Sequence, residues 1–196
     1  MMRIIAGKAN RRKLEALEGE DITRPTSERV KEGLFSAIQF ELSGKRVLDL
    51  FAGTGQLALE ALSRGADSAV LTDDSADAVE IIKLNAKNTG LMKQCRISRI
   101  DYSEFLKSAA LKKEKFDIVF LDPPYAKDMK NEILKKVSRA DIMNPGALIV
   151  CETDNDFLGE DTSVFGFSLR KKYRYGKTFV TLLQYEVNMS DAEETQ

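Results

Sequence analysis

Apolar residues along the middle of the chain recur with two alternating periods. Runs such as Val47-Leu48-Asp49-Leu50-Phe51 and Ile118-Val119-Phe120-Leu121 are short and apolar on both faces, as strands buried between helix layers are. Between such runs, apolar residues return every three or four positions and glycines end the segments, which predicts amphipathic helices. The alternation of strands and helices indicates a parallel sheet covered by helices.

The first helix is predicted over 27–41, where Pro25 ends an extended lead, Thr26 can cap, and apolar residues follow at helical spacing. A second helix is predicted between the glycines at 53 and 55 and Gly65. The other predicted helices cover 75–89 and 103–111, and the predicted strands cover 47–51, 68–72, 95–100, 116–121 and 148–151.

Beyond residue 160 the period changes to two, on both sides of Tyr175-Gly176-Lys177, which predicts a closing hairpin. The expected fold class is therefore α/β, a doubly wound Rossmann-like sheet of seven strands, mostly parallel, with an antiparallel edge strand. An N-terminal arm and helix (1–44) precede the main domain (45–187), and an acidic disordered tail (188–196) follows it. In such folds, ligands bind beyond the carboxyl ends of the strands.

Composition excludes several kinds of chemistry. The chain has no histidine, which rules out catalytic triads, His-ligated zinc and imidazole acid–base catalysis. Cys95 and Cys151 lie too far apart in sequence for a CxxC pair, and both are expected in the core. No apolar run has the length of a membrane span or a signal peptide, so we expect a cytoplasmic protein that needs neither membrane nor metal.

The net charge of −1 hides two basic segments that contain no acidic residue. The first fourteen residues carry Arg3, Lys8, Arg11, Arg12 and Lys13, and residues 163–185 carry Arg170, Lys171, Lys172, Arg174 and Lys177. A single basic segment is usually a solvated surface. Two such segments around a catalytic-looking centre favour contact with phosphates, although the solvated surface remains the alternative interpretation.

A glycine-rich turn follows the first strand, in the run Asp49-Leu50-Phe51-Ala52-Gly53-Thr54-Gly55. Glycines let a ligand approach the backbone, and Asp73 at the end of the next strand can accept both hydroxyls of a ribose. The pattern predicts an adenosine-containing cofactor held by Asp49, Ala52, Gly53, Thr54, Gly55 and Asp73. Asp49 favours S-adenosylmethionine over NAD, because a carboxylate there suits an ammonium group and repels a pyrophosphate.

The run Asp122-Pro123-Pro124-Tyr125 follows the fourth strand. Two prolines fix the backbone and remove two N–H donors, so the loop presents acceptors only. The Asp122 carboxylate and the Pro123 carbonyl can together hold both hydrogens of an exocyclic amino group, while Tyr125 stacks on the base. A rigid surface turn is the alternative interpretation.

These motifs together resemble the RsmD-type 16S ribosomal RNA methyltransferases, over about residues 3–186. The resemblance rests on Arg3-Ile4-Ile5-Ala6-Gly7-Lys8, on the run from Arg24-Pro25-Thr26 to Leu34-Phe35, on the two motifs above, and on Tyr173-Arg174-Tyr175-Gly176. It implies a class I S-adenosylmethionine-dependent enzyme that methylates N2 of a guanine in 16S rRNA or the small ribosomal subunit. We expect this enzyme to be a monomer.

The resemblance also implies residue roles. Asp101 would accept the adenine amino group, the backbone N–H of Tyr102 would face the same ring, and Thr26 and Asp74 would lie by the cofactor. The candidate RNA contacts are Arg3, Lys8, Arg11, Arg12, Lys13, Arg24, Arg174 and Lys177. Two positions depart from the family: Arg11 replaces a usual glycine, and Asp73-Asp74-Ser75 replaces a usual Glu-x-Asp.

Three alternatives remain at this point. A DNA adenine or protein glutamine methyltransferase would share the motif at Asp122, but would ordinarily need an added substrate domain. A catalytically idle RNA-binding assembly factor could keep the fold without the reaction. An NAD oxidoreductase could share the glycine turn, but would bind nicotinamide cofactors in place of S-adenosylhomocysteine.

Overall fold

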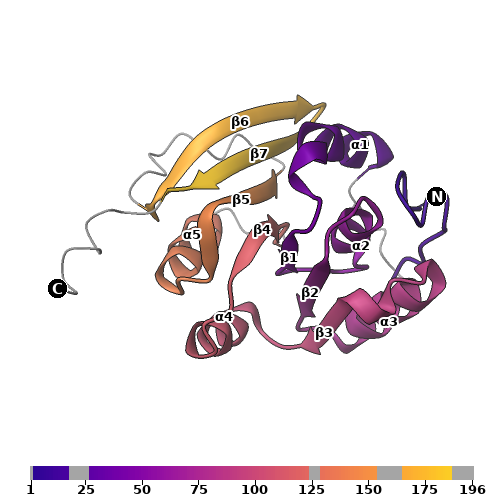
Figure 1. Ribbon diagram of the computed structural model, residues 1–196, viewed down its shortest axis with the longest axis horizontal. Helices are drawn as coiled ribbons and strands as arrows, with labels where there is room; N and C mark the ends of the chain where they lie inside the picture. The colour runs from indigo at the N-terminus through magenta and orange to yellow at the C-terminus, as the bar shows by residue number, and fades with distance from the viewer. Residues whose placement is uncertain (1, 18–26, 124–128, 154–164, 187–196) are drawn as a thin grey trace.

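The computed structural model describes residues 2–17, 27–123, 129–153 and 165–186 of the chain. Seven strands form one sheet in the order β3-β2-β1-β4-β5-β7-β6, with helices on both faces (Figure 1). The strands are β1 (Arg46–Asp49), β2 (Ser68–Asp73), β3 (Cys95–Arg99), β4 (Phe116–Leu121), β5 (Met143–Thr153), β6 (Phe167–Tyr175) and β7 (Thr178–Tyr185). The helices are α1 (Glu28–Ala37), α2 (Gln56–Ser63), α3 (Ala76–Thr89), α4 (Tyr102–Leu111) and α5 (Met129–Arg139), with short 3-10 turns η1 (Gln39–Glu41) and η2 (Met92–Gln94).

The sheet confirms the predicted fold class. Strands β1 to β5 pair in parallel, whereas β7 runs antiparallel to both β5 and β6. The closing hairpin places β6 at the edge and β7 between β5 and β6. Because Thr153 pairs with Phe179 and Tyr175 pairs with Thr178, the turn of this hairpin lies at the carboxyl end of β5.

Two apolar clusters hold the layers together. On one face α1, α2 and α3 bury side chains such as Leu34, Leu57 and Ile82. On the other face α4 and α5 bury Phe105 and Ile133 against the sheet. Burial of this kind on both faces explains why the central strands are apolar throughout.

The N-terminal arm is a small hairpin packed on α2. Arg3 bridges Lys13, and Ile4 is fully buried in the cluster that contains α1 and α2. The buried carboxylate of Glu60 accepts the N–H groups of Ile5 and Ala6 at 2.8 and 3.0 Å. The arm and α1 therefore share the core of the sheet, and the boundary at residue 44 stays a prediction about chain organisation.

The buried pair of Lys31 and Glu60 explains how the arm is held. The Lys31 ammonium lies 3.4 Å from the Glu60 carboxylate and donates to the carbonyl of Arg3 at 2.6 Å. Arg64 donates to the same carboxylate at 2.8 Å. Burial lowers the pKa of Lys31, and the neighbouring Glu60 carboxylate opposes that shift.

Helix α5 was absent from the sequence-based prediction, although Ile133, Leu134 and Val137 are buried at helical spacing. The predicted cap of α1 was also wrong, because Ser27 is the N-cap and its hydroxyl accepts the N–H of Val30 at 3.3 Å. Helix α1 ends at Ala37 rather than at residue 41, because the backbone tightens into the 3-10 turn η1. Strand β5 begins at Met143, five residues before the apolar run that predicted it.

No helix of the described residues combines the length and apolar character that crossing a bilayer requires. Within the same ranges, no group of three or more cysteine, aspartate or glutamate side chains lies close enough together to hold a metal ion.

Candidate active site

Three carboxylates lie at the carboxyl ends of three neighbouring strands. Asp49 of β1 pairs in register with Leu71 of β2 and with Phe120 of β4. Asp73 and Asp122 each stand two residues beyond those partners. Side chains two residues apart share one face of a strand. The register therefore places Asp73 and Asp122 on either side of β1, at the carboxyl ends of the parallel strands.

The glycine turn after β1 adopts the conformation that its sequence predicts. Gly53 has a φ of 53° and Gly55 a φ of 78°, both in the left-handed region that favours glycine. A methyl group on Gly55 would come within 3.2 Å of Leu71 and 3.3 Å of Ile82, so this glycine packs the turn against the sheet. A methyl group on Gly53 would meet nothing within 4 Å, which leaves that side of the turn open.

The carboxylate of Asp73 organises the turn. One oxygen accepts the N–H of Gly53 at 2.9 Å, and the other accepts the N–H of Ser75 at 3.0 Å. A carboxylate has about four lone-pair sites, so Asp73 can still accept a ligand hydroxyl. Burial is the main cause that raises the pKa of Asp73, and backbone hydrogen bonds from Ser75, Gly53 and Asp74 oppose it. Asp74 is exposed, and its carbonyl accepts Arg99 Nε at 3.0 Å.

Asp49 lies beneath the turn and is fully buried. Its Oδ2 accepts the N–H of Ala58 in the first turn of α2, at 3.3 Å. Burial raises the pKa of Asp49 from 3.8 to about 7, with a smaller contribution from the nearby Asp73 charge. Thr54 and Ala52 are also buried, so of the predicted cofactor residues in this turn Gly53 offers the open surface.

Asp101 and Tyr102 follow β3, at the same edge of the sheet. Asp101 is the N-cap of α4, and its Oδ1 accepts the N–H of Ser103 at 2.8 Å. The Tyr102 ring lies 5.3 Å from the Phe51 ring, and its hydroxyl accepts Lys136 Nζ at 3.1 Å. These contacts turn the Tyr102 ring toward α5, so any contact of Tyr102 with the cofactor falls to its backbone N–H.

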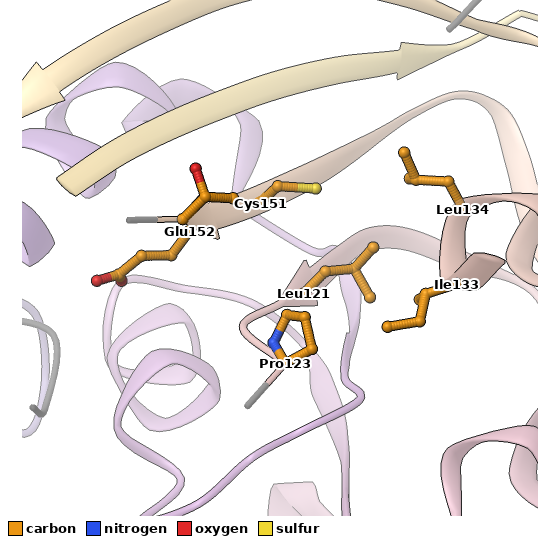
Figure 2. A pocket seen from close by; sticks show the side chains of 7 residues that line it. Leu121, Pro123, Ile133, Leu134, Cys151 and Glu152 are labelled. Atoms are coloured by element: carbon orange, nitrogen blue, oxygen red, sulfur yellow. The ribbon is translucent and has the colours of Figure 1, made fainter. Parts of the chain in front are cut away.

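The segment that starts at Asp122, which we call the acceptor loop, begins where β4 ends. Asp122 is exposed and Pro123 is buried, whereas Pro124 and Tyr125 lie outside the described residues, as do Arg24 and Thr26. Figure 2 shows the Pro123 ring beside Leu121, with Ile133 and Leu134 of α5 across a small pocket. The Glu152 side chain extends away from those two α5 residues. This packing fixes the start of the loop against α5 and the carboxyl end of β5.

The hairpin turn brings Arg174 and Lys177 to the same edge of the sheet. Both are exposed, and the Arg174 guanidinium lies 5.4 Å from the centre of the Phe179 ring. Tyr175 packs on α1 so closely that a methyl group on Gly33 would lie 2.2 Å from its hydroxyl oxygen. Tyr175 also stacks on Tyr173 with ring centres 6.3 Å apart. The β6–β7 hairpin and α1 therefore pack into one surface beside the acceptor loop, which we call the hairpin wall.

The basic residues of the arm occupy a different position. The N–H of Lys8 donates to the carbonyl of Ser63, the last residue of α2, at 2.8 Å. The turn of the arm thus lies about 12 Å from the glycine turn, the length of the eight-residue helix α2. Arg3 pairs with Glu28 at 3.0 Å, and Lys8 donates to Gln94. The exposed Arg11, Arg12 and Lys13 form no ion pair with any residue that the structure describes.

Arg11 has a backbone conformation that favours glycine. Its φ is 64°, in the left-handed region, and its N–H donates to the carbonyl of Ile4 at 2.9 Å. The backbone of the arm therefore keeps a glycine-type conformation with an arginine in place, at a cost of about 1 kcal/mol.

Sequence reasoning missed two buried polar residues. Glu60, which anchors the arm, is fully buried, and so is Asn85 of α3. Both stand among apolar positions of amphipathic helices, and a polar residue on the buried face of a helix is the signal that could have found them.

Comparisons with known proteins identify the family of the chain. The family model described as Conserved hypothetical protein 95 matches residues 2–184. Ribosomal RNA small subunit methyltransferase D of Escherichia coli strain K12 is 32% identical over 194 residues, which are 98% of this chain and 94% of that protein. The protein of the same name from Haemophilus influenzae is 34% identical over 156 residues, which are 79% of this chain and 80% of that protein.

Solved structures show the same similarity. The protein yhhF of Escherichia coli has a TM-score of 0.82 and is 28% identical, with 95% of this chain and 99% of that chain covered. The protein TTHA0928 of Thermus thermophilus has a TM-score of 0.78 and is 29% identical, with 95% and 100% covered. Because the family model spans nearly the whole length and named relatives exceed 30% identity, the chain belongs to the RsmD-type family of small-subunit ribosomal RNA methyltransferases.

Proposed function

We propose that the protein uses S-adenosylmethionine to methylate the exocyclic N2 amino group of a guanine in 16S rRNA. The observation that carries this proposal is the register of the sheet, which sets the cofactor carboxylate Asp73 and the acceptor carboxylate Asp122 on either side of β1. The family relationship supports rRNA as the substrate. The small ribosomal subunit as partner, the monomeric state and the cytoplasmic location stay predictions.

The residues around the glycine turn fit S-adenosylmethionine. Gly53 leaves open space beside the turn, and the Asp73 carboxylate next to it can accept ribose hydroxyls. Asp49 is a buried carboxylate with no cationic partner among the described residues, and burial raises its pKa. A methionyl ammonium would supply the missing positive charge. A pyrophosphate would instead add negative charge near two carboxylates, which disfavours a dinucleotide.

Asp101 and the backbone N–H of Tyr102 complete this proposed site on the adenine side. The helix cap uses Oδ1 of Asp101, and Oδ2 would accept the amino group of the adenine. Exposed Asp74 would lie at the rim, and Thr26 is proposed to approach from the segment before α1.

When bound, S-adenosylmethionine would supply the methyl group: as N2 of the guanine bonds to the methyl carbon in line, the bond from that carbon to sulfur breaks and S-adenosylhomocysteine leaves as a neutral thioether. Asp122 and the Pro123 carbonyl would accept the two N–H groups of the amine, which aligns its lone pair with the methyl carbon. Positive charge develops on N2 as the bond to the methyl carbon forms, and the Asp122 carboxylate stabilises it. A proton then leaves N2, and exposed Asp122 can pass it to solvent.

The RNA would approach over the wall formed by the hairpin and α1. Arg174 and Lys177 stand at this edge of the sheet and can bind phosphates next to the target nucleotide. The guanine must leave its stack to reach Asp122, and Tyr125 is proposed to stack on it. Arg24 would join these contacts, while Lys8, Arg11 and Arg12 at the turn of the arm would bind phosphates farther from the reaction. Arg3 and Lys13, which form a bridge between the two strands of the arm, would also bind phosphates.

The test is transfer of labelled methyl groups from S-adenosylmethionine to small subunits from cells that lack this protein, followed by nucleoside analysis. The expected product is N2-methylguanosine. Labelled N6-methyladenosine would show that the substrate is an adenine, and labelled protein would show that it is a protein. Binding of subunits without any methyl transfer would indicate an assembly factor.

A further inference from the structure

A buried asparagine joins the N-terminal arm to the glycine turn. Asn85 of α3 is fully buried, and its Nδ2 donates to the carbonyl of Thr54 at 2.9 Å and to the carbonyl of Glu15 at 3.0 Å. Its Oδ1 accepts the N–H of Glu15 at 2.7 Å. The amide therefore uses both hydrogens and its oxygen, and all three bonds go to backbone groups outside its own helix.

A second contact reaches the same turn from the other strand of the arm. The Thr54 hydroxyl donates to the sulfur of Met2 at 3.3 Å, and Met2 pairs with Leu14 through a backbone bond of 3.0 Å. Thr54 is buried and lies between Gly53 and Gly55. One strand of the arm thus contacts Thr54 directly through Met2, and the other strand is linked to Thr54 through Asn85.

We propose that Asn85 is a positioning residue that makes the N-terminal arm part of the cofactor site. The proposal rests on the proposed binding of S-adenosylmethionine at the glycine turn. Glycines leave this turn with many accessible conformations, so an ordered turn needs outside restraint. Asn85 supplies it by tying the Thr54 carbonyl to Glu15 in the second strand of the arm. Elsewhere in the arm, Glu60 and Ser63 of α2 accept the N–H groups of Ile5 and Ala9.

Linkage gives this arrangement a measurable consequence. If the arm restrains the turn and thereby favours the cofactor, the cofactor must in turn stabilise the arm. S-adenosylhomocysteine should therefore slow hydrogen exchange in residues 2–17, even though the turn of the arm lies at the far end of α2.

The sharpest variant removes one hydrogen bond and leaves the core intact. Glu15 has an exposed side chain, and its backbone N–H is the donor to Asn85. Glu15→Pro removes this N–H, whereas Glu15→Ala keeps it and serves as the matched control. A second pair tests the amide itself: Asn85→Asp loses both donors, whereas Thr89→Val on the same helix loses a buried hydroxyl that bonds only to α3 carbonyls.

The experiment measures S-adenosylhomocysteine affinity by calorimetry at 25 °C, together with hydrogen exchange and melting temperature for each variant. We expect Glu15→Pro to weaken affinity about fivefold and Asn85→Asp at least tenfold, and both to lose the ligand-dependent protection of residues 2–17. Glu15→Ala and Thr89→Val should bind as the wild type does, although Thr89→Val should melt earlier. Rescue of affinity by Asn85→Gln, if its longer amide reaches the same carbonyls, would support positioning further.

Two results would overturn the inference while leaving the proposed function intact. One is equal affinity of Glu15→Pro and Glu15→Ala, and the other is ligand binding to the wild type without protection of the arm. Absence of S-adenosylhomocysteine binding by the wild-type protein would instead overturn the proposed function and this inference with it.

Discussion

Asp73 accepts the backbone N–H of Gly53 at 2.9 Å, so the carboxylate proposed to hold the ribose also shapes the glycine turn. Asp73→Ala should therefore weaken S-adenosylhomocysteine binding by about 2 kcal/mol, close to thirtyfold. Calorimetry gives the affinity, and Asp77→Ala, which alters an exposed acid in the first turn of α3, is the control. If Asp74→Ala lost affinity and Asp73→Ala did not, Asp74 would be the residue that binds the ribose.

Asp49 should make both stability and ligand affinity depend on pH. Burial raises its pKa to about 7, so between roughly pH 4 and 7 the folded protein holds a proton that the unfolded chain has released. The contribution of Asp49 to stability is therefore lost as pH rises through this window. Asp49→Asn removes the cost, and we expect it to raise the melting temperature at pH 8.

Asp49→Asn should also weaken ligand binding. The methionyl ammonium favours the charged carboxylate, so wild-type affinity for S-adenosylhomocysteine should rise from pH 6 to pH 8. In the Asp49→Asn variant, affinity should be lower and nearly flat over this range. Wild-type affinity that is equal at pH 6 and pH 8 would show that no ammonium approaches Asp49.

Gly33 should matter for the RNA substrate rather than for the cofactor. A methyl group there would lie 2.2 Å from the Tyr175 hydroxyl oxygen, so Gly33→Ala must displace Tyr175 from α1. Alanine is the better helix former by about 1 kcal/mol, which keeps the variant folded. We expect the KM for small subunits to rise several-fold, with unchanged ligand affinity.

Two further variants make the Gly33 result specific. Tyr175→Leu should give the same rise in KM without any change in α1. Ser36→Ala, at an exposed position of α1, should behave as the wild type does. An unchanged KM for small subunits in both Gly33→Ala and Tyr175→Leu would show that the hairpin wall does not contact the RNA.

The two basic surfaces can be separated by salt dependence. Replacing Arg11, Arg12 and Lys13 by glutamine should flatten the slope of log K against log salt for small-subunit binding by about two, at about 0.7 per phosphate. Replacing Arg174 and Lys177 should flatten it by about 1.4. Ligand affinity should stay constant in both. An unaltered slope in the arm variant would leave the hairpin as the RNA-binding surface.

The sequence predicted the elements whose signals are local. The strand before Gly53 and the strand before Asp122 are apolar on both faces, and the alternation with helices made a parallel sheet the natural arrangement. Helix α5 was missed because, among its described side chains, only Ile133, Leu134 and Val137 mark its buried face, and Lys135 and Lys136 lie between Leu134 and Val137. The choice of Ser27 over Thr26 as cap could not be made either, because both hydroxyls suit a helix start.

Sequence motifs predicted the part of the site that lies directly after the strands, and they did not predict the residues that support it. Gly53, Asp73 and Asp122 follow strands in the sequence, and the carboxyl ends of parallel strands meet at one edge. The roles of Glu60 and Asn85 depend on partners more than fifty residues away in the arm, which no local pattern specifies. The position of Arg11 at the far end of α2 likewise depends on tertiary packing.

The most direct test of the account is the single-turnover rate of methyl transfer to small subunits by Asp122→Ala at saturating S-adenosylmethionine. We expect the rate to fall at least about 100-fold, roughly 3 kcal/mol, while S-adenosylhomocysteine affinity stays within a few-fold of the wild type. Asp141→Ala, which alters an exposed acid paired with Lys115, is the control and should keep the full rate. An Asp122→Ala protein that forms N2-methylguanosine at the wild-type rate would contradict the account.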